Sequence, residues 1–163
     1  MVFSQNNLNL PAYYNAASGA AGIINPAVHL LNNEPVKISR GVALYRSGDK
    51  KKLWITNLEP QVQWGLAQGT HRIIADTDKL VGPYFAISGN KIAYLEGDGL
   101  MQNCWLVNES GEAVMIAEGI AAGDLQLYQD EFWAMLSWRD RHNGILYYCN
   151  LNGDLSIKAL TGS

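Results

Sequence analysis

Residues 85–94 read Phe-Ala-Ile-Ser-Gly-Asn-Lys-Ile-Ala-Tyr, and residues 104–111 read Cys-Trp-Leu-Val-Asn-Glu-Ser-Gly. Both segments combine apolar runs of strand length with a Gly-containing turn of the kind that joins antiparallel strands. A further apolar run of strand length follows at residues 113–117. The stretch from residue 85 to residue 117 therefore predicts four short strands joined by tight turns.

The same arrangement recurs on both sides of this stretch. A large aromatic residue stands three positions before an Asn in Trp54/Asn57, Trp105/Asn108 and Tyr147/Asn150. This Asn recurs after 51 and then 42 residues, and the excess of the first interval falls in residues 70–82. The units span roughly 36–69, 83–119 and 124–162. A four-strand unit repeating every ~40–45 residues is typical of a β-propeller blade.

Residues 85–111 resemble the blade of TolB-type and related propellers, which has an "Ile-Ala-Tyr"-like strand and then a strand ending in Asn before a Gly turn. Residues 147–154 are similar, and the first unit is similar only loosely. The resemblance covers residues 36–162 and implies an all-β fold with about three four-stranded propeller-like units in a repeat domain, 36–163. It implies an interaction platform rather than a reaction. A closed propeller has four or more blades, so another subunit completes the ring or the units form an open array.

The first 35 residues do not follow the repeat. Glu34 is their only formally charged residue, and Pro11, Pro26 and Pro35 interrupt any long helix or strand. We expect an irregular N-terminal arm over 1–35 that needs a surface to cover it. It either wraps its own domain or docks on a neighbouring subunit. The apolar residues that would make the docking contact are Ile23, Ile24, Val28, Leu30 and Leu31.

Motifs for catalysis, cofactors or metals are missing from the sequence. His29, His71 and His142 have no paired ligand spacing, and neither a Gly-x-Ser-x-Gly elbow nor a phosphate-binding Gly loop is present. Aspartates at positions 98, 124, 130 and 140 would serve as paired carboxylates or, more simply, as turn caps. Cys104 and Cys149 fit two buried thiols, with a disulfide between them left open. We therefore expect a protein that is not an enzyme and has no cofactor.

The loop at residues 138–144 is the best sequence candidate for ligand binding. An aromatic ring, two guanidinium groups and a carboxylate come together there, which suits a sugar-binding site of the lectin type. The candidate residues are Trp138, Arg139, Asp140, Arg141 and His142. The equivalent loop of the second unit, residues 97–103, lacks the aromatic and most of the charge. The tryptophans at positions 54, 105 and 133 lie in strand patterns and suit packing, and Trp64 is left open.

Charge and hydropathy restrict the partners further. The 163 residues carry a formal net charge of -3, and only 17% are charged. Nucleic acid is not an expected partner, because phosphate binding needs a basic surface. The basic run at residues 50–52 lies in a predicted hairpin loop. No apolar stretch has the ~18 residues that a membrane span needs, and residues 1–7 do not read as a secretory leader.

These observations favour a non-enzymatic structural or interaction protein. We expect a subunit of a larger assembly, whose arm docks on a neighbouring subunit. A virion component of a phage or other virus (a capsid decoration, tail or fibre part) suits the composition by analogy. The alternative is a carbohydrate-binding module that uses the Trp138 loop to bind a glycan. The compartment is open, with a virion or the cytoplasm most compatible.

Overall fold

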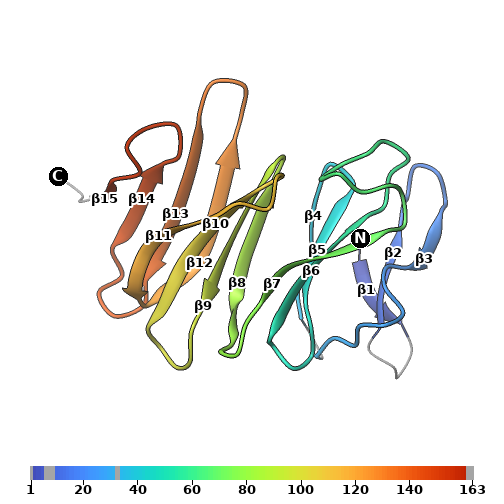
Figure 1. Cartoon of the computed structure of the whole chain (residues 1–163), viewed down its shortest axis with the longest axis horizontal. Coiled ribbons are helices and arrows are strands. Elements are labelled where there is room, and N and C mark those ends of the chain that lie inside the picture. The colour runs from blue at the N-terminus through green and yellow to red at the C-terminus, as the bar shows by residue number, and fades with distance from the viewer. Residues whose placement is uncertain (1, 6–9, 32–33, 161–163) are drawn as a thin grey trace. The chain divides into compact units, whose positions relative to one another are not determined.

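The computed structural model describes residues 2–5, 10–31 and 34–160 (Figure 1). Residues 1, 6–9 and 32–33 of the expected arm, and residues 161–163 of the expected repeat domain, lie outside this range. The chain divides into two compact parts, Met1–Asp78 and Lys79–Ser163. From here on these two parts are called the first unit and the second unit, and the four-strand repeats are called sheets. The regular elements of the described residues are all strands, and they form four antiparallel sheets. The predicted all-β fold is thus confirmed.

The first unit contains two sheets. The N-terminal sheet has the order β1–β2–β3, formed by Val2–Gln5, Leu10–Tyr14 and Ala21–Ile23. The first four-stranded sheet, here the first sheet, has the order β4–β5–β6–β7. Its strands are Lys37–Ser39, Val42–Arg46, Lys52–Asn57 and His71–Asp76.

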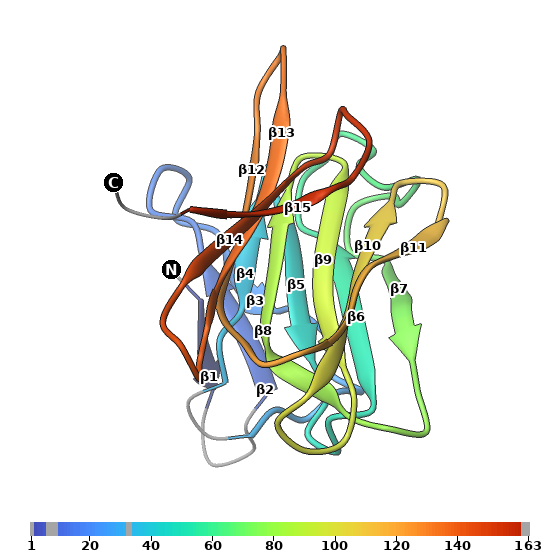
Figure 2. The same cartoon turned by 90° about the vertical axis from the view of Figure 1, so that its left-hand side faces the viewer.

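The second unit contains two four-stranded sheets. The second sheet is formed by β8 (Val81–Ser88), β9 (Lys91–Glu96), β10 (Gln102–Asn108) and β11 (Ala113–Ile120). The third sheet is formed by β12 (Ala122–Gln129), β13 (Ala134–Asp140), β14 (Leu146–Asn150) and β15 (Ile157–Leu160). Consecutive strands pair in both sheets, as in propeller blades. Figure 2 views the third sheet, in orange to red, from its outer side.

The core of the second unit lies between its two sheets. The first strands of these sheets, β8 and β12, are neighbours. Leu95 and Cys104 of the second sheet share one apolar cluster with Leu136, Trp138 and Cys149 of the third. Period-two alternation places these third-sheet residues on one face, which we call the inner face. The second sheet therefore covers the inner face of the third.

Equivalent positions of the three sheets carry the same aromatic pair. Trp54 lies directly opposite Tyr45 on the neighbouring strand, Trp105 lies opposite Tyr94, and Tyr147 lies opposite Trp138. Each pair joins the second and third strands of its sheet, where facing aromatic rings stabilise the pairing. The second-strand member is buried in all three sheets. The structure thus places the recurring aromatic positions in matching environments.

The recurring Asn shapes the turn after the third strand. The side-chain oxygens of Asn57, Asn108 and Asn150 each accept a hydrogen bond from the backbone N–H two residues further on, at 3.0, 3.1 and 3.0 Å. This Asx geometry stabilises a turn without help from a neighbouring strand. The same residue therefore ends the same strand in each sheet.

Two sequence expectations are corrected. The fourth strand of the first sheet is β7, which lies in residues 70–82, the stretch that the repeat spacing had treated as excess. The additional residues form the loop between Asn57 and His71, which winds around Asn57 instead of returning as a tight hairpin. The N-terminal arm is also not irregular throughout, because antiparallel pairing of Val2–Gln5, Leu10–Tyr14 and Ala21–Ile23 satisfies its backbone hydrogen bonds.

Candidate functional site

The hairpin tip after β13 uses most of its charged groups to hold its own shape. The Asp140 carboxylate accepts the backbone N–H groups of His142 and Asn143 at 2.8 and 3.0 Å. These bonds, that of Asn143 first, lower the pKa of Asp140 from its ordinary value of 3.8. Arg139 donates to the carbonyl of Gly144 at 2.8 Å, and Arg141 donates to the carbonyl of Leu100 at 3.0 Å. The tip is therefore held by bonds within its own turn and by one bond to the loop that carries Leu100.

Trp138 does not present an aromatic face at this tip. Its side chain is 2% exposed and lies in the core between the second and third sheets, stacked on Tyr147 with ring centroids 6.0 Å apart. The sequence contained a signal for this burial, since Trp138 precedes Tyr147 by the same nine residues that separate Tyr45 from Trp54. The tryptophan that does face solvent is Trp133, which the strand pattern assigned to packing and which is 47% exposed.

The docking residues predicted in the N-terminal segment have two different environments. Ile24, Val28 and Leu30 are buried against Ala43 and Tyr45 of the first sheet. Ile23 and Leu31 are 43% and 39% exposed. The described part of the segment thus wraps its own unit, which was the simpler of the two expectations for it. Burial of this kind leaves Ile24, Val28 and Leu30 unavailable to a partner.

Polar contacts fix this segment on the first sheet. Glu34 forms a two-pronged ion pair with the buried Arg46 of β5. The buried Asn25 amide donates to the Tyr45 hydroxyl at 3.0 Å. The Tyr45 hydroxyl is also hydrogen-bonded to the Thr56 hydroxyl at 2.6 Å, which is in turn hydrogen-bonded to Nδ1 of His71 at 2.8 Å. Either hydroxyl can donate in the bond between Tyr45 and Thr56, and Nδ1 of His71 accepts from Thr56 only while it carries no proton. Partial burial lowers the pKa of His71 below its ordinary 6.5, which favours this unprotonated form.

The outer face of the third sheet carries exposed apolar side chains. Directly opposed residues of an antiparallel sheet share a face, so the registers Tyr128↔Met135, Met135↔Asn150, Tyr148↔Lys158 and Leu146↔Leu160 place these side chains together. Tyr128 is 51% exposed and Leu160 is 59% exposed. Trp133 meets Tyr128 edge-on, with ring centroids 5.8 Å apart.

A hollow of about 180 Å³ lies on the same outer face. Trp133, Met135 and Tyr148 supply its apolar lining, while Asp154 and Lys158 contribute one charge of each sign. The Ser156 backbone N–H lowers the pKa of Asp154, so this carboxylate is ionised at neutral pH. The face therefore combines an aromatic patch with opposite charges at its rim.

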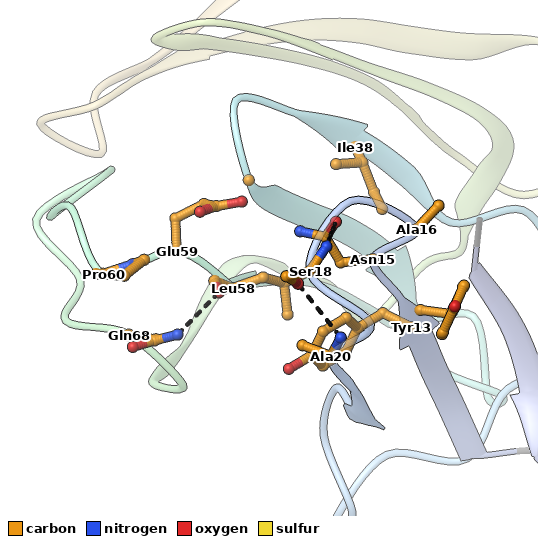
Figure 3. A pocket seen from close by; sticks show the side chains of 12 residues that line it. Tyr13, Asn15, Ala16, Ser18, Ala20, Ile38, Leu58, Glu59, Pro60 and Gln68 are labelled. Carbon is orange, nitrogen blue, oxygen red and sulfur yellow. Dashed lines mark hydrogen bonds between the residues drawn. The ribbon is translucent and has the colours of Figure 1, made fainter.

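The first unit carries a larger pocket of about 530 Å³, shown in Figure 3. Tyr13, Asn15 and Ser18 from the β2–β3 hairpin lie on one side, and Leu58, Glu59 and Gln68 from the loop after β6 lie on the other (Figure 3). Sequence reasoning missed this pocket, because the hairpin and the loop on its two sides are some 45 residues apart in the chain.

Thiol and metal chemistry receive little support from the described residues. Cys104 and Cys149 are free and buried, and burial raises the pKa of Cys104 to about 12, which keeps the thiol protonated. No group of three or more His, Cys, Asp or Glu side chains that could hold a metal ion occurs in the described part of the chain. Among residues 2–5, 10–31 and 34–160, no helix is long and apolar enough to span a membrane.

Comparison with known proteins identifies the fold. No family model matches the chain, and no curated protein does. Among solved structures the chain is similar to TolB from Acinetobacter baumannii, with a TM-score of 0.55 over 94% of this chain at 12% identity. The match covers 37% of that TolB chain, which is a β-propeller. The described sheets thus have the architecture of propeller-like blades, as the resemblance in the sequence had implied.

Proposed function

We propose that the protein is a non-enzymatic structural subunit that assembles by pairing the outer face of its third sheet with that of a second copy. The observation on which the proposal rests is that the two faces of this sheet differ in burial. Its inner face is buried against the second sheet, whereas its outer face leaves Tyr128, Trp133 and Leu160 about half exposed. A blade with one uncovered aromatic face is typical of a surface that needs a partner.

Two features support a second copy as that partner. In a head-to-tail chain of copies, the outer face would meet the Tyr45 face of the next copy's first sheet, which is equivalent to the inner face of the third. The protein's own Ile24, Val28 and Leu30 already cover that Tyr45 face, so such a chain would have to displace them. Two third sheets, by contrast, can meet directly.

A two-fold contact also suits the charges of the outer face. In a two-fold contact the same surface of both copies faces itself, and each pairwise contact occurs twice. Lys158 of one copy can therefore approach Asp154 of the other, and the reverse. The opposite charges at the rim thus become complementary when the sheet pairs with itself. A virion is one assembly for which such a subunit is suited.

Light scattering of the purified chain across a wide range of concentration tests the proposal. We expect a concentration-dependent dimer with twice the monomer mass. The double substitution Tyr128→Lys and Trp133→Lys places two charges on the outer face, and should shift the dimer to monomer because those charges would have to be desolvated in the contact. Both side chains are exposed in the monomer, so the fold should remain.

A matched control separates this contact from general surface effects. Val62 is also a large exposed apolar residue, 67% exposed, but it lies in the loop after β6 of the first unit. Val62→Lys should therefore leave the dimer intact. A monomer at every concentration, or a double variant that dimerises as well as the wild-type chain, would contradict the proposal.

A further inference from the structure

One wall of the pocket in the first unit is the loop after β6, which contributes Leu58, Glu59 and Gln68 and is here called the loop wall. Gly41 and Asn57 fix its position. Gly41 has a φ of 74°, and a Cβ atom there would overlap Cγ of Glu59, so the stem of Glu59 occupies the space that a side chain would take. The Glu59 backbone N–H is bonded to the Asn57 side chain at 3.0 Å. The amide nitrogen of Asn57 also donates to the carbonyls of Gln61 and Leu66 at 2.8 and 2.7 Å. Asn57 thus holds the wall that carries Glu59.

The hairpin wall is organised in a similar way. The side-chain oxygen of Asn15 accepts the backbone N–H groups of Ala17 and Ser18 at 2.9 and 3.3 Å. Its amide nitrogen is left as a donor with no partner among the described residues. The Ser18 hydroxyl accepts the Ala20 N–H at 3.2 Å. These local bonds hold the hairpin without using the donor of Asn15.

The opposite wall offers acceptors. Gln68 donates its amide nitrogen to the carbonyl of Leu58 at 3.2 Å, which leaves its side-chain oxygen available. The Glu59 carboxylate, an acceptor when ionised, has no hydrogen-bond partner among the described residues. The pocket therefore presents a donor on the hairpin side and acceptors on the loop side, and Tyr13 and Tyr14 are among the residues that line it.

The lining restricts the chemistry of a ligand. Glu59 is the only formally charged residue among the twelve described residues that line the pocket, so an anion would meet a carboxylate and no cation. An amine would satisfy the acceptors but not the donor of Asn15. A hydroxyl group both donates and accepts, and a sugar ring adds an apolar face that can stack on tyrosine. A volume of about 530 Å³ falls in the usual range of small-molecule sites, ~300–1,000 Å³.

We propose that this pocket is a binding site for an uncharged mono- or disaccharide, with Glu59 and Gln68 accepting ligand hydroxyls and Asn15 donating to one. The site belongs to the first unit and shares no residue with the Trp138 loop that the sequence had suggested for sugar binding. It is also independent of self-association, since none of its residues belongs to the outer face of the third sheet.

Calorimetric titration of the full chain with a sugar panel tests the site. The panel contains glucose, galactose, mannose, N-acetylglucosamine, lactose and cellobiose, with phenethylamine as an amine probe. We expect at least one sugar to bind and the amine not to bind. Glu59→Gln keeps the shape of the side chain but removes its charge-assisted hydrogen bond, and should weaken sugar binding about tenfold or more.

Glu118→Gln is the matched control, because Glu118 is an exposed carboxylate on β11 of the other unit. It should bind the sugar as the wild-type chain does. Thermal unfolding of both variants verifies that each is folded. Failure of every sugar in the panel to bind, undiminished binding by Glu59→Gln, or binding of the amine in place of a sugar would each overturn the proposal.

Discussion

At the scale of single residues, the three recurring asparagines differ in how much they hold. Asn108 and Asn150 accept hydrogen bonds within a short turn that is open to solvent. Asn57 is fully buried and, besides accepting from Glu59, donates to two carbonyls of a thirteen-residue connection. One side chain thus takes the place of a hairpin in the first sheet.

Asn57→Ala should therefore destabilise the protein far more than the same change at Asn150. Loss of three partly buried hydrogen bonds, two of which leave backbone carbonyls without this donor, should lower the free energy of unfolding by about 2–4 kcal/mol. Asn150→Ala removes a solvent-exposed turn bond and should cost roughly 1 kcal/mol or less. Urea unfolding of the two variants measures the difference. Equal losses would show that Asn57 does not organise the loop.

Gly41 is required both for its backbone angle and for the space it leaves to Glu59. Gly41→Ala should lower the free energy of unfolding by about 2–4 kcal/mol, from left-handed strain and displacement of Glu59. Gly65 has a similar φ of 68°, but a Cβ atom added there would meet no atom within 4 Å. Gly65→Ala should therefore cost only the strain, about 1 kcal/mol. If the two variants unfold at the same urea concentration, the contact with Glu59 is of no consequence.

At the scale of elements, the strands of the second and third sheets could be predicted from their apolar runs and Gly turns, because each pairs with its neighbour in sequence. The fourth strand of the first sheet could not be placed by spacing, since the preceding loop is stabilised by a buried Asn rather than by turn residues. The position of the second strand of the third sheet was the other feature that the sequence predicted wrongly. The apolar run at residues 132–137 assigned Trp133 to packing, whereas the strand begins at Ala134 and buries Trp138 instead.

The series of side-chain hydrogen bonds that links Asn25, Tyr45, Thr56 and His71 makes the attachment of the N-terminal segment sensitive to pH. The folded pKa of His71 is lowered from 6.5, so the unfolded state binds more protons between that folded pKa and 6.5. The free energy of unfolding should therefore fall as the pH is lowered from about 7 through 6.5. Carboxylates with lowered pKa values, such as Asp140, contribute at lower pH, below their ordinary value of 3.8.

His71→Asn tests this dependence, because the Asn oxygen can still accept from Thr56 but does not titrate. The variant should lose the part of the pH dependence that appears as the pH falls from about 7 through 6.5, measured by urea unfolding at several pH values. His142→Asn, at the exposed hairpin tip, provides the comparison and should keep the wild-type profile. A wild-type stability that is constant over this interval would contradict the role given to His71.

At the scale of the whole molecule, the sequence identified the all-β architecture but not the surfaces with the best claim to function. The pocket depends on a hairpin and a loop that are distant in sequence, and its hydrogen-bond directions follow only from the folded loops. The outer face of the third sheet depends on which side of a strand is covered. Alternation in the sequence marks two faces, and only the core formed by Leu95, Cys104 and Leu136 shows which one is buried.

The expectation of an assembly protein is retained as a proposal, with its contact surface moved. The apolar N-terminal segment had suggested the docking site, but Ile24, Val28 and Leu30 are committed to the first sheet. The uncovered outer face of the third sheet is now the proposed docking surface.

The most direct test maps that face by nuclear magnetic resonance as the protein is diluted. We expect backbone signals of residues 126–137 and 146–160 to shift with concentration, while those of the first unit and of the inner-core residues Leu95 and Cys104 stay constant. Signals that do not change on dilution, or changes centred on residues 23–31, would contradict self-association through the outer face of the third sheet.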